Sequence, residues 1–242
     1  MNRKNRNPLE IRETKITKNF LENPLGSVLI ETGKTKVICT VMCEEAVPSW
    51  LESDPSKKGW LTARYGMLPG SGDSRIDRET KGVRGRTQEI QRLIGRALRA
   101  SLDLEILGPR TLWVDCDVIQ ADGGTRTASI TGSWVALFLA GQKLLENAVV
   151  SDSPVVGQVA ATSVGLSKGN ILVDMCYKED SVADVDMNVV MDSDGNYIEV
   201  QSSAEGHVFT REQHEAMLDA ASEGIRELFK VQRDAAGLRF FG

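Results

Sequence analysis

The stretch that decides the fold runs from residue 111 to residue 147 and reads TLWVDCDVIQADGGTRTASITGSWVALFLAGQKLLEN. Its first ten residues carry aliphatic or thiol side chains at every second position, as a strand with one buried face does. The polar turn ADGGTR follows at 121–126, and the apolar run at 128–147 is long enough for a buried helix. The segment therefore predicts a strand, a glycine turn and a helix.

The turn of this segment has the composition of an anion site. Gly123 and Gly124 let the backbone approach a ligand closely, and a helix start presents unpaired N–H groups and the positive end of its dipole. Thr125 adds a hydroxyl, and Arg126 adds a planar cation suited to oxyanions. The Gly-Lys-Ser/Thr ending of a nucleotide-binding P-loop is absent, so phosphate without a nucleotide base is expected. An ordinary tight turn of the same composition stays open as an alternative.

Hairpins precede helices in both halves of the chain. Further strands are expected at 27–32, 36–41, 155–166, 171–177, 187–191 and 197–201, and further helices at 87–104 and 210–232. The last helix opens with Thr210-x-x-Gln213, the spacing of a capping box. This order predicts an α+β fold of two fused β-then-α units.

Composition narrows the class of protein. The chain has 242 residues, of which 41% are hydrophobic, and a net charge of −5. No apolar run approaches the length of a membrane span, and the polar, basic N-terminus predicts no signal peptide. The four cysteines lack zinc-site spacing, which indicates core thiols in a cytoplasmic protein. The chain has only two histidines, so catalysis by a histidine base and metal sites built from several histidines are not expected.

Positive charge is concentrated in one segment despite the acidic average. Residues 75–99 contain eight basic and three acidic residues, a balance that suits a polyanionic partner. Arg92, Arg96 and Arg99 follow helical spacing on one face. That stripe is either a solvated face paired with neighbouring acids, such as Glu89 and Asp103, or a contact to RNA or to another subunit.

A second candidate anion site opens the arginine-rich helix. Gly85, Arg86 and Thr87 repeat the combination of a glycine, an arginine and a threonine, with Thr87 expected as the N-cap. Two such helix starts can converge on one phosphate.

An acidic group lies in the connection between the strands expected at 171–177 and 187–191. Asp184 and Asp186 alternate onto one face of an extended chain, and Asp180 precedes them in a bend. Carboxylates without His or Cys suit Mg²⁺, although a solvated acidic loop is the open alternative. Together these parts fit inorganic phosphate as nucleophile, Mg²⁺ offsetting charge on an RNA phosphodiester, and an aspartic acid protonating the leaving 3′-oxygen.

Long motifs resemble the ribonuclease PH family in order from about residue 8 to about residue 232. They are GWLTARYGMLP at 59–69, GRTQEIQRLI at 85–94, DCDVIQADGGTRTASITG at 115–132, EDS at 179–181, DVDMNVVM at 184–191, IEVQ at 198–201 and AEG at 204–206. The resemblance implies the ribosomal protein S5 domain 2-like fold, in a single domain over residues 1–242.

The resemblance also implies an activity. Members of the family trim nucleotides beyond the CCA end of tRNA precursors by 3′→5′ phosphorolysis, release nucleoside diphosphates, catalyse the reverse addition, and form hexameric rings of three dimers. Carried over by position, Arg86, Gly124, Thr125 and Arg126 correspond to the phosphate site, and Asp180 and Asp186 to the acidic, Mg²⁺-binding pair. The RNA-gripping, ring-building region corresponds to the basic loop and arginine helix, with Arg75, Arg78, Arg92, Arg96 and Arg99.

Two departures from the family pattern lie outside these phosphate and metal positions. Gly70–Arg75 replaces an arginine followed by a Thr-His-Thr-Arg-like stretch, and Arg64 stands where glutamate is common. We therefore expect the chemistry to be retained. The alternatives are a non-catalytic RNA-binding subunit of an exosome-like ring, which would typically have lost these arginines or aspartates, and a metal-dependent phosphatase.

Overall fold

The computed structural model describes residue 3, residues 6–204 and residues 208–238. Glu205 and Gly206 of the AEG motif, His207 and four of the first five residues lie outside this part. The elements follow in the order β1 (Thr14–Lys18), β2 (Gly26–Thr32), β3 (Thr35–Glu44), β4 (Trp60–Met67), α1 (Gly85–Arg99), α2 (Leu104–Leu107), β5 (Thr111–Gln120), α3 (Thr125–Glu146), β6 (Val159–Ser167), β7 (Asn170–Val173), α4 (Tyr177–Asp180), β8 (Val185–Asp192), β9 (Tyr197–Ala204) and α5 (Arg211–Ala236).

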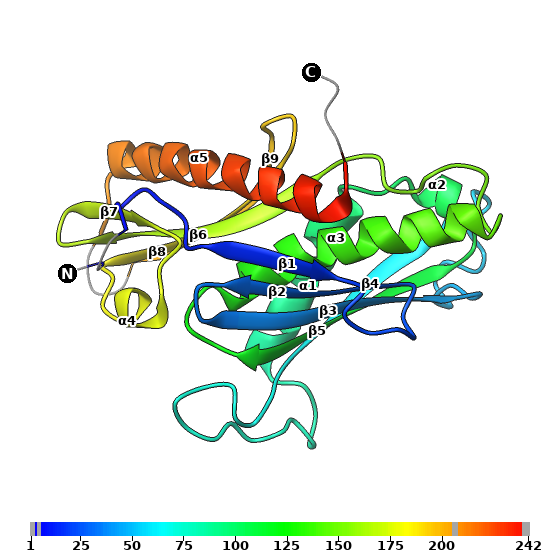
Figure 1. The fold of residues 1–242 in the computed structure, drawn as a ribbon, viewed down its shortest axis with the longest axis horizontal. Helices are drawn as coiled ribbons and strands as arrows, with labels where there is room; N and C mark the ends of the chain where they lie inside the picture. The colour runs from blue at the N-terminus through cyan, green and yellow to red at the C-terminus, as the bar shows by residue number, and fades with distance from the viewer. Residues whose placement is uncertain (1–2, 4–5, 205–207, 239–242) are drawn as a thin grey trace.

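Two sheets carry these strands within the described residues. The first has the order β1-β2-β3-β5-β4, antiparallel except for the parallel pair β4–β5, and the second has the antiparallel order β7-β6-β8-β9. α3 packs on β2 and β3 of the first sheet and on β6 of the second, while α5 covers β6 (Figure 1). The predicted α+β class is confirmed.

The hydrophobic core explains why α3 is apolar on nearly all sides. Fourteen of its residues are buried, because strands lie on one side of it and α1, β6 and α5 on others. One apolar cluster joins the first sheet, α1 and α3 and includes Val159, Ala161 and Val190 of the second sheet. A separate cluster packs the second sheet against α5.

Several predicted elements are confirmed and some bounds are wrong. The β2–β3 hairpin turns at Gly33-Lys34, β5 covers 111–120 as predicted, and Thr210 caps α5 in the predicted capping box. The strand predicted for 171–177 ends at Val173, and Tyr177 instead begins α4. The chain leaves the strand at Asp174, which has a φ of +50° and whose carboxylate is bound by the distant Arg12, a contact that no local pattern reveals.

Candidate active site

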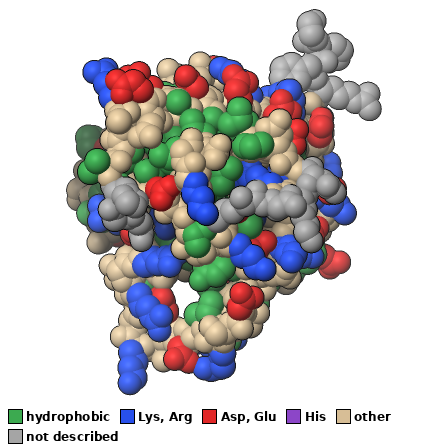
Figure 2. All heavy atoms as spheres, turned by 90° about the vertical axis from the view of Figure 1, so that its left-hand side faces the viewer, with side chains coloured by type: hydrophobic (Ala, Val, Ile, Leu, Met, Phe, Trp, Pro, Cys, Tyr) green, Lys and Arg blue, Asp and Glu red, His purple; other side chains and the backbone are tan. Residues whose placement is uncertain are grey.

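A cleft of about 910 Å³ opens beside the ends of β5 and α4. Its walls come from the β4–α1 loop, the start of α1, the β5–α3 turn, α4 and β8. The lining residues considered below are Arg86, Asp122, Gly123, Gly124, Thr125, Arg126, Tyr177, Asp180 and Asp186. The β4–α1 loop extends away from the body of the molecule (Figure 1). On the face seen in Figure 2, Lys and Arg side chains lie around the middle and over this projecting loop.

The β5–α3 turn supplies one wall and begins α3. Gly123 and Gly124 have φ angles of +75° and +66°, which only glycine adopts without strain, and Gly124 is the N-cap of α3. The first turn of the helix therefore directs its N–H groups and dipole at the cleft. Side chains of the first two helical residues, Thr125 and Arg126, line the cleft beside them.

Thr125 and Arg126 are held by neighbours that the sequence did not single out. The Tyr65 hydroxyl lies 2.8 Å from Thr125 Oγ1, and burial raises the pKa of Tyr65, so this phenol is neutral at physiological pH. Arg126 Nη1 lies 3.8 Å from the Glu89 carboxylate and donates to Gln201 Oε1 at 3.5 Å. Both Arg126 contacts are long, which leaves its guanidinium able to bind an oxyanion.

Arg86 reaches the same cleft from α1, so the structure brings the two helix starts together. Thr87, however, is not the N-cap of α1, and this prediction was wrong. The helix begins at Gly85 after Arg84, and the Thr87 hydroxyl donates to Glu79 at 2.6 Å. The Glu79 carboxylate from the β4–α1 loop also accepts the Arg84 N–H at 3.2 Å. A carboxylate from that loop therefore accepts hydrogen bonds at the start of α1, where negative charge is favourable.

Asp180 and Asp186 face the cleft from α4 and β8. Asp184 does not join them, because its carboxylate accepts the Lys168 N–H at 2.8 Å in the β6–β7 turn. Within the described residues no group of three or more His, Cys, Asp or Glu side chains is arranged to hold a metal ion. Two carboxylates in a cleft with an anion site fit Mg²⁺, which keeps several waters and takes further oxygens from a bound phosphate.

The five arginines predicted to contact RNA are outside the cleft lining. Arg75 pairs with Asp77 on the projecting loop, which also carries the exposed Arg78, and Arg92 is exposed on α1. Arg96 forms a two-pronged ion pair with Glu199 of β9 at 2.6 and 2.9 Å. Arg99 lies over the Trp60 ring at 4.4 Å and donates to Leu61 O, so it packs α1 on β4.

The sequence and fold of the chain match a known family. The "3′ exoribonuclease family, domain 1" matches residues 10–143, and "3′ exoribonuclease family, domain 2" matches residues 157–224. The chain belongs to this family of 3′ exoribonucleases. Within it, the chain is 54% identical over 235 residues to "Ribonuclease PH" of Bacillus cereus (strain B4264), covering 96% of this chain and 95% of the relative.

Solved structures share the fold at lower identity. The Archaeoglobus fulgidus exosome with RNA bound to the active site aligns with a TM-score of 0.79 and 22% identity, covering 93% of this chain and 90% of that one. Rice (Oryza sativa) Rrp46 aligns with a TM-score of 0.77 and 17% identity, covering 96% and 98%. The predicted ribonuclease PH-type fold and exoribonuclease class are confirmed. No helix in the described ranges is long and apolar enough to span a membrane.

Proposed function

We propose that this exoribonuclease shortens the 3′ ends of tRNA precursors by phosphorolysis, in the cleft between α3, α1 and α4. The observation that carries the proposal is that Arg86, Thr125, Arg126, Asp180 and Asp186 all line one cleft. Two arginines, a hydroxyl and a helix N-terminus make a site for inorganic phosphate, and the two carboxylates line the same cleft. No serine, cysteine or histidine nucleophile is needed, since phosphate is itself the nucleophile.

The residues act mainly by positioning and by charge. Arg86, Arg126 and the α3 N-terminus bind phosphate and orient one oxygen toward the last phosphodiester of the RNA. A bond forms between that oxygen and phosphorus, the bond to the 3′-oxygen breaks, and a nucleoside diphosphate leaves. The shortened RNA accepts a proton on its new 3′-oxygen; the donor is Asp180 or Asp186 in its protonated form, with the donating carboxyl not bound to the metal ion in that step. The reverse reaction adds a nucleotide to an RNA 3′ end.

Asp180 and Asp186 would hold Mg²⁺ in this site. When bound, the ion supplies positive charge that offsets the negative charge gathered on the two phosphates. Asp180 on α4 and Asp186 on β8 line the same cleft as Thr125 and Arg126, so an ion that they held would share the cleft with a bound phosphate.

The arginines outside the cleft belong to the proposed RNA path. Arg75, Arg78 and Arg92 are exposed on the loop and on α1, where they can contact phosphates along the RNA backbone. Arg96 and Arg99 extend the positive charge of α1, although each also has a contact within the chain. Ribosomal RNA and other 3′ ends are further substrates of the same path.

Assembly and location complete the proposal. The chain forms a homohexameric ring, a trimer of dimers. Its two matched segments fold as one domain, because one apolar cluster includes residues of both sheets. Cytoplasmic residence agrees with Cys39 and Cys116, which face each other across β3 and β5 as free thiols. Light scattering that detects only monomer at micromolar concentration would contradict the ring.

The decisive experiment is a product assay. A 3′-extended tRNA incubated with enzyme, Mg²⁺ and phosphate should release nucleoside diphosphates, and leaving out phosphate should stop the reaction. Monophosphates would indicate a hydrolase, and no release would indicate a non-catalytic subunit. Arg126→Ala should raise the phosphate KM or abolish turnover with the fold intact, whereas Arg226→Ala, which removes an exposed ion pair on α5, should behave as wild type.

A further inference from the structure

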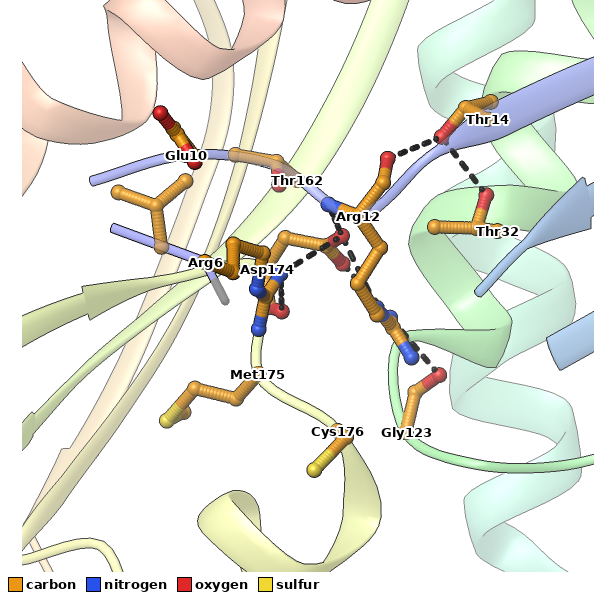
Figure 3. Close-up of polar contacts among 12 residues, drawn as sticks. Arg6, Glu10, Arg12, Thr14, Thr32, Gly123, Thr162, Asp174, Met175 and Cys176 are labelled. Carbon is orange, nitrogen blue, oxygen red and sulfur yellow. Dashed lines mark hydrogen bonds and ion pairs between the residues drawn. The ribbon is translucent and has the colours of Figure 1, made fainter. Parts of the chain in front are cut away.

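A buried ion pair joins the N-terminal segment to Asp174, the residue that directly follows β7. Arg12 donates through Nη2 to Asp174 Oδ1 at 2.6 Å and through Nε to Oδ2 at 3.0 Å, and its backbone N–H donates to Oδ2 at 2.7 Å (Figure 3). The two side chains are 8% and 5% exposed. A buried ion pair adds little net stability, because desolvation offsets the attraction. The other hydrogen bonds of Arg12 indicate a role besides stability.

The free edge of the same guanidinium holds the anion-binding turn. Arg12 Nη1 donates to Asp122 O at 2.6 Å, and Nη2 donates to Gly123 O at 3.3 Å. Burial alone would lower the pKa of Arg12, but the hydrogen bonds to Asp174 outweigh it and the pKa is raised. The guanidinium therefore stays charged throughout the working pH range.

Thr35, at the start of β3, holds this turn with a second set of bonds. Its hydroxyl donates to Gly123 O at 2.7 Å and accepts the Asp122 N–H at 2.9 Å, and the residue is fully buried. Arg12 and Thr35 thus satisfy the backbone groups of the turn directly before the residues that begin α3.

The turn is in contact with the segment that carries Asp180. A Cβ added at Gly123 would lie 2.6 Å from Met175 O and 2.7 Å from Cys176 C, so backbone packs against backbone here. The Asp122 carboxylate also accepts the Tyr177 N–H at 3.3 Å, at the first residue of α4. A shift of the turn therefore moves the phosphate-binding end of α3 relative to α4.

We propose that Arg12 and Thr35 are positioning residues that set the separation between the phosphate-binding end of α3 and Asp180 on α4. Neither residue lines the cleft, so neither touches substrate. Their effect on the reaction passes through Asp122 and Gly123. This inference rests on the proposed function, because it assumes that the cleft binds phosphate.

The test compares conservative variants of the two residues. Thr35→Val removes both hydrogen bonds at nearly constant volume, and Arg12→Lys keeps the charge but cannot bridge Asp174 and the two carbonyls together. Each variant should raise the phosphate KM about tenfold or more, since small displacements of a positioned group cost that much, and should leave the RNA KM near its wild-type value. Thr35→Ser, which keeps the hydroxyl, should restore the phosphate KM.

A matched control separates positioning from stability. Thr111→Val makes the same substitution in the same sheet, where the buried hydroxyl donates to Ala46 O at 2.7 Å, far along β5 from the turn. It should lower the melting temperature and leave the phosphate KM unchanged. Titration of inorganic phosphate into each protein without RNA, followed by calorimetry, gives a second readout that does not depend on turnover.

The outcomes distinguish this inference from the proposed function. If the wild-type protein neither binds phosphate nor requires it, the proposed function fails. If the wild type binds phosphate and Thr35→Val matches it in Kd and KM, losing only thermal stability as Thr111→Val does, the positioning role is wrong. Should Arg12→Lys not fold, the pair Thr35→Val and Thr35→Ser still decides.

Discussion

Replacing Gly123 by alanine is a sharp test of the contact between the anion-binding turn and the segment before α4. The new Cβ would stand 2.6 Å from Met175 O and 2.8 Å from Tyr177 N, both backbone atoms that cannot rotate away. Overpacking of this kind costs about 1–3 kcal/mol. The φ of +75° adds about 1–2 kcal/mol for a residue with a Cβ. We therefore expect Gly123→Ala to lower the free energy of unfolding by about 2–5 kcal/mol.

Gly169 provides the matched control for this prediction. Its φ is +77°, close to that of Gly123, but an added Cβ would meet nothing within 4 Å. Gly169→Ala should therefore lose only the conformational part, about 1–2 kcal/mol. Urea denaturation of both variants measures the difference, and phosphorolysis of a 3′-extended tRNA should fall only in Gly123→Ala. Equal destabilisation and equal turnover in the two variants would refute the close contact.

Three further predictions follow from single contacts. Tyr65→Phe removes the hydroxyl 2.8 Å from Thr125 Oγ1, a bond of about 0.5–1.5 kcal/mol, and should raise the phosphate KM several-fold in steady-state kinetics; an unchanged KM would exclude that role. Burial would raise the pKa of Glu179, but hydrogen bonds from Arg3 and from the Cys176 N–H outweigh it, and the pKa of Glu179 in the folded protein is lowered. The ionised Glu179 therefore stabilises the folded protein fully above about pH 4.5, and this stabilisation is lost as the pH falls through the lower pKa of the folded state. Melting curves of wild type and Glu179→Gln should therefore converge as the solution is acidified, and a constant gap would contradict this. Thr210→Ala removes the side-chain cap of α5 and should cost about 1 kcal/mol in urea denaturation with normal turnover; no loss of stability would argue against the cap.

Local chemistry was sufficient to predict the elements whose signal lies within a few residues. The β2–β3 hairpin, the bounds of β5 and the cap of α5 each depend on neighbours in the chain, and all three are confirmed. β4 was not predicted, although Leu61, Ala63 and Tyr65 alternate along it as buried residues; the structure pairs it parallel to β5, about fifty residues further along the chain. α4 was mistaken for the end of a strand, since Asp174 is held by Arg12.

In the candidate site, too, some features were predicted from the sequence and others depend on contacts between distant segments. The residue types and long motifs in the sequence pointed to a phosphate-using exoribonuclease, and the family match confirms that class. The sequence also singled out Arg86, Thr125, Arg126, Asp180 and Asp186, which line one cleft and remain a proposed site. The supporting contacts of Tyr65, Thr35 and Arg12 were not predicted, since no spacing rule relates residues 60 to 162 positions apart.

By itself, the sequence determined the class of fold, the cap of α5 and the kind of chemistry, because hydrophobic periodicity, capping residues and charge act over one or two turns of chain. Only the tertiary structure decided that the two helix starts and the two aspartates share a cleft, and that a buried arginine from the N-terminal segment holds the turn between them. The physical reason is that such contacts form when packing brings distant segments together, and burial then selects partners by geometry as well as by residue type.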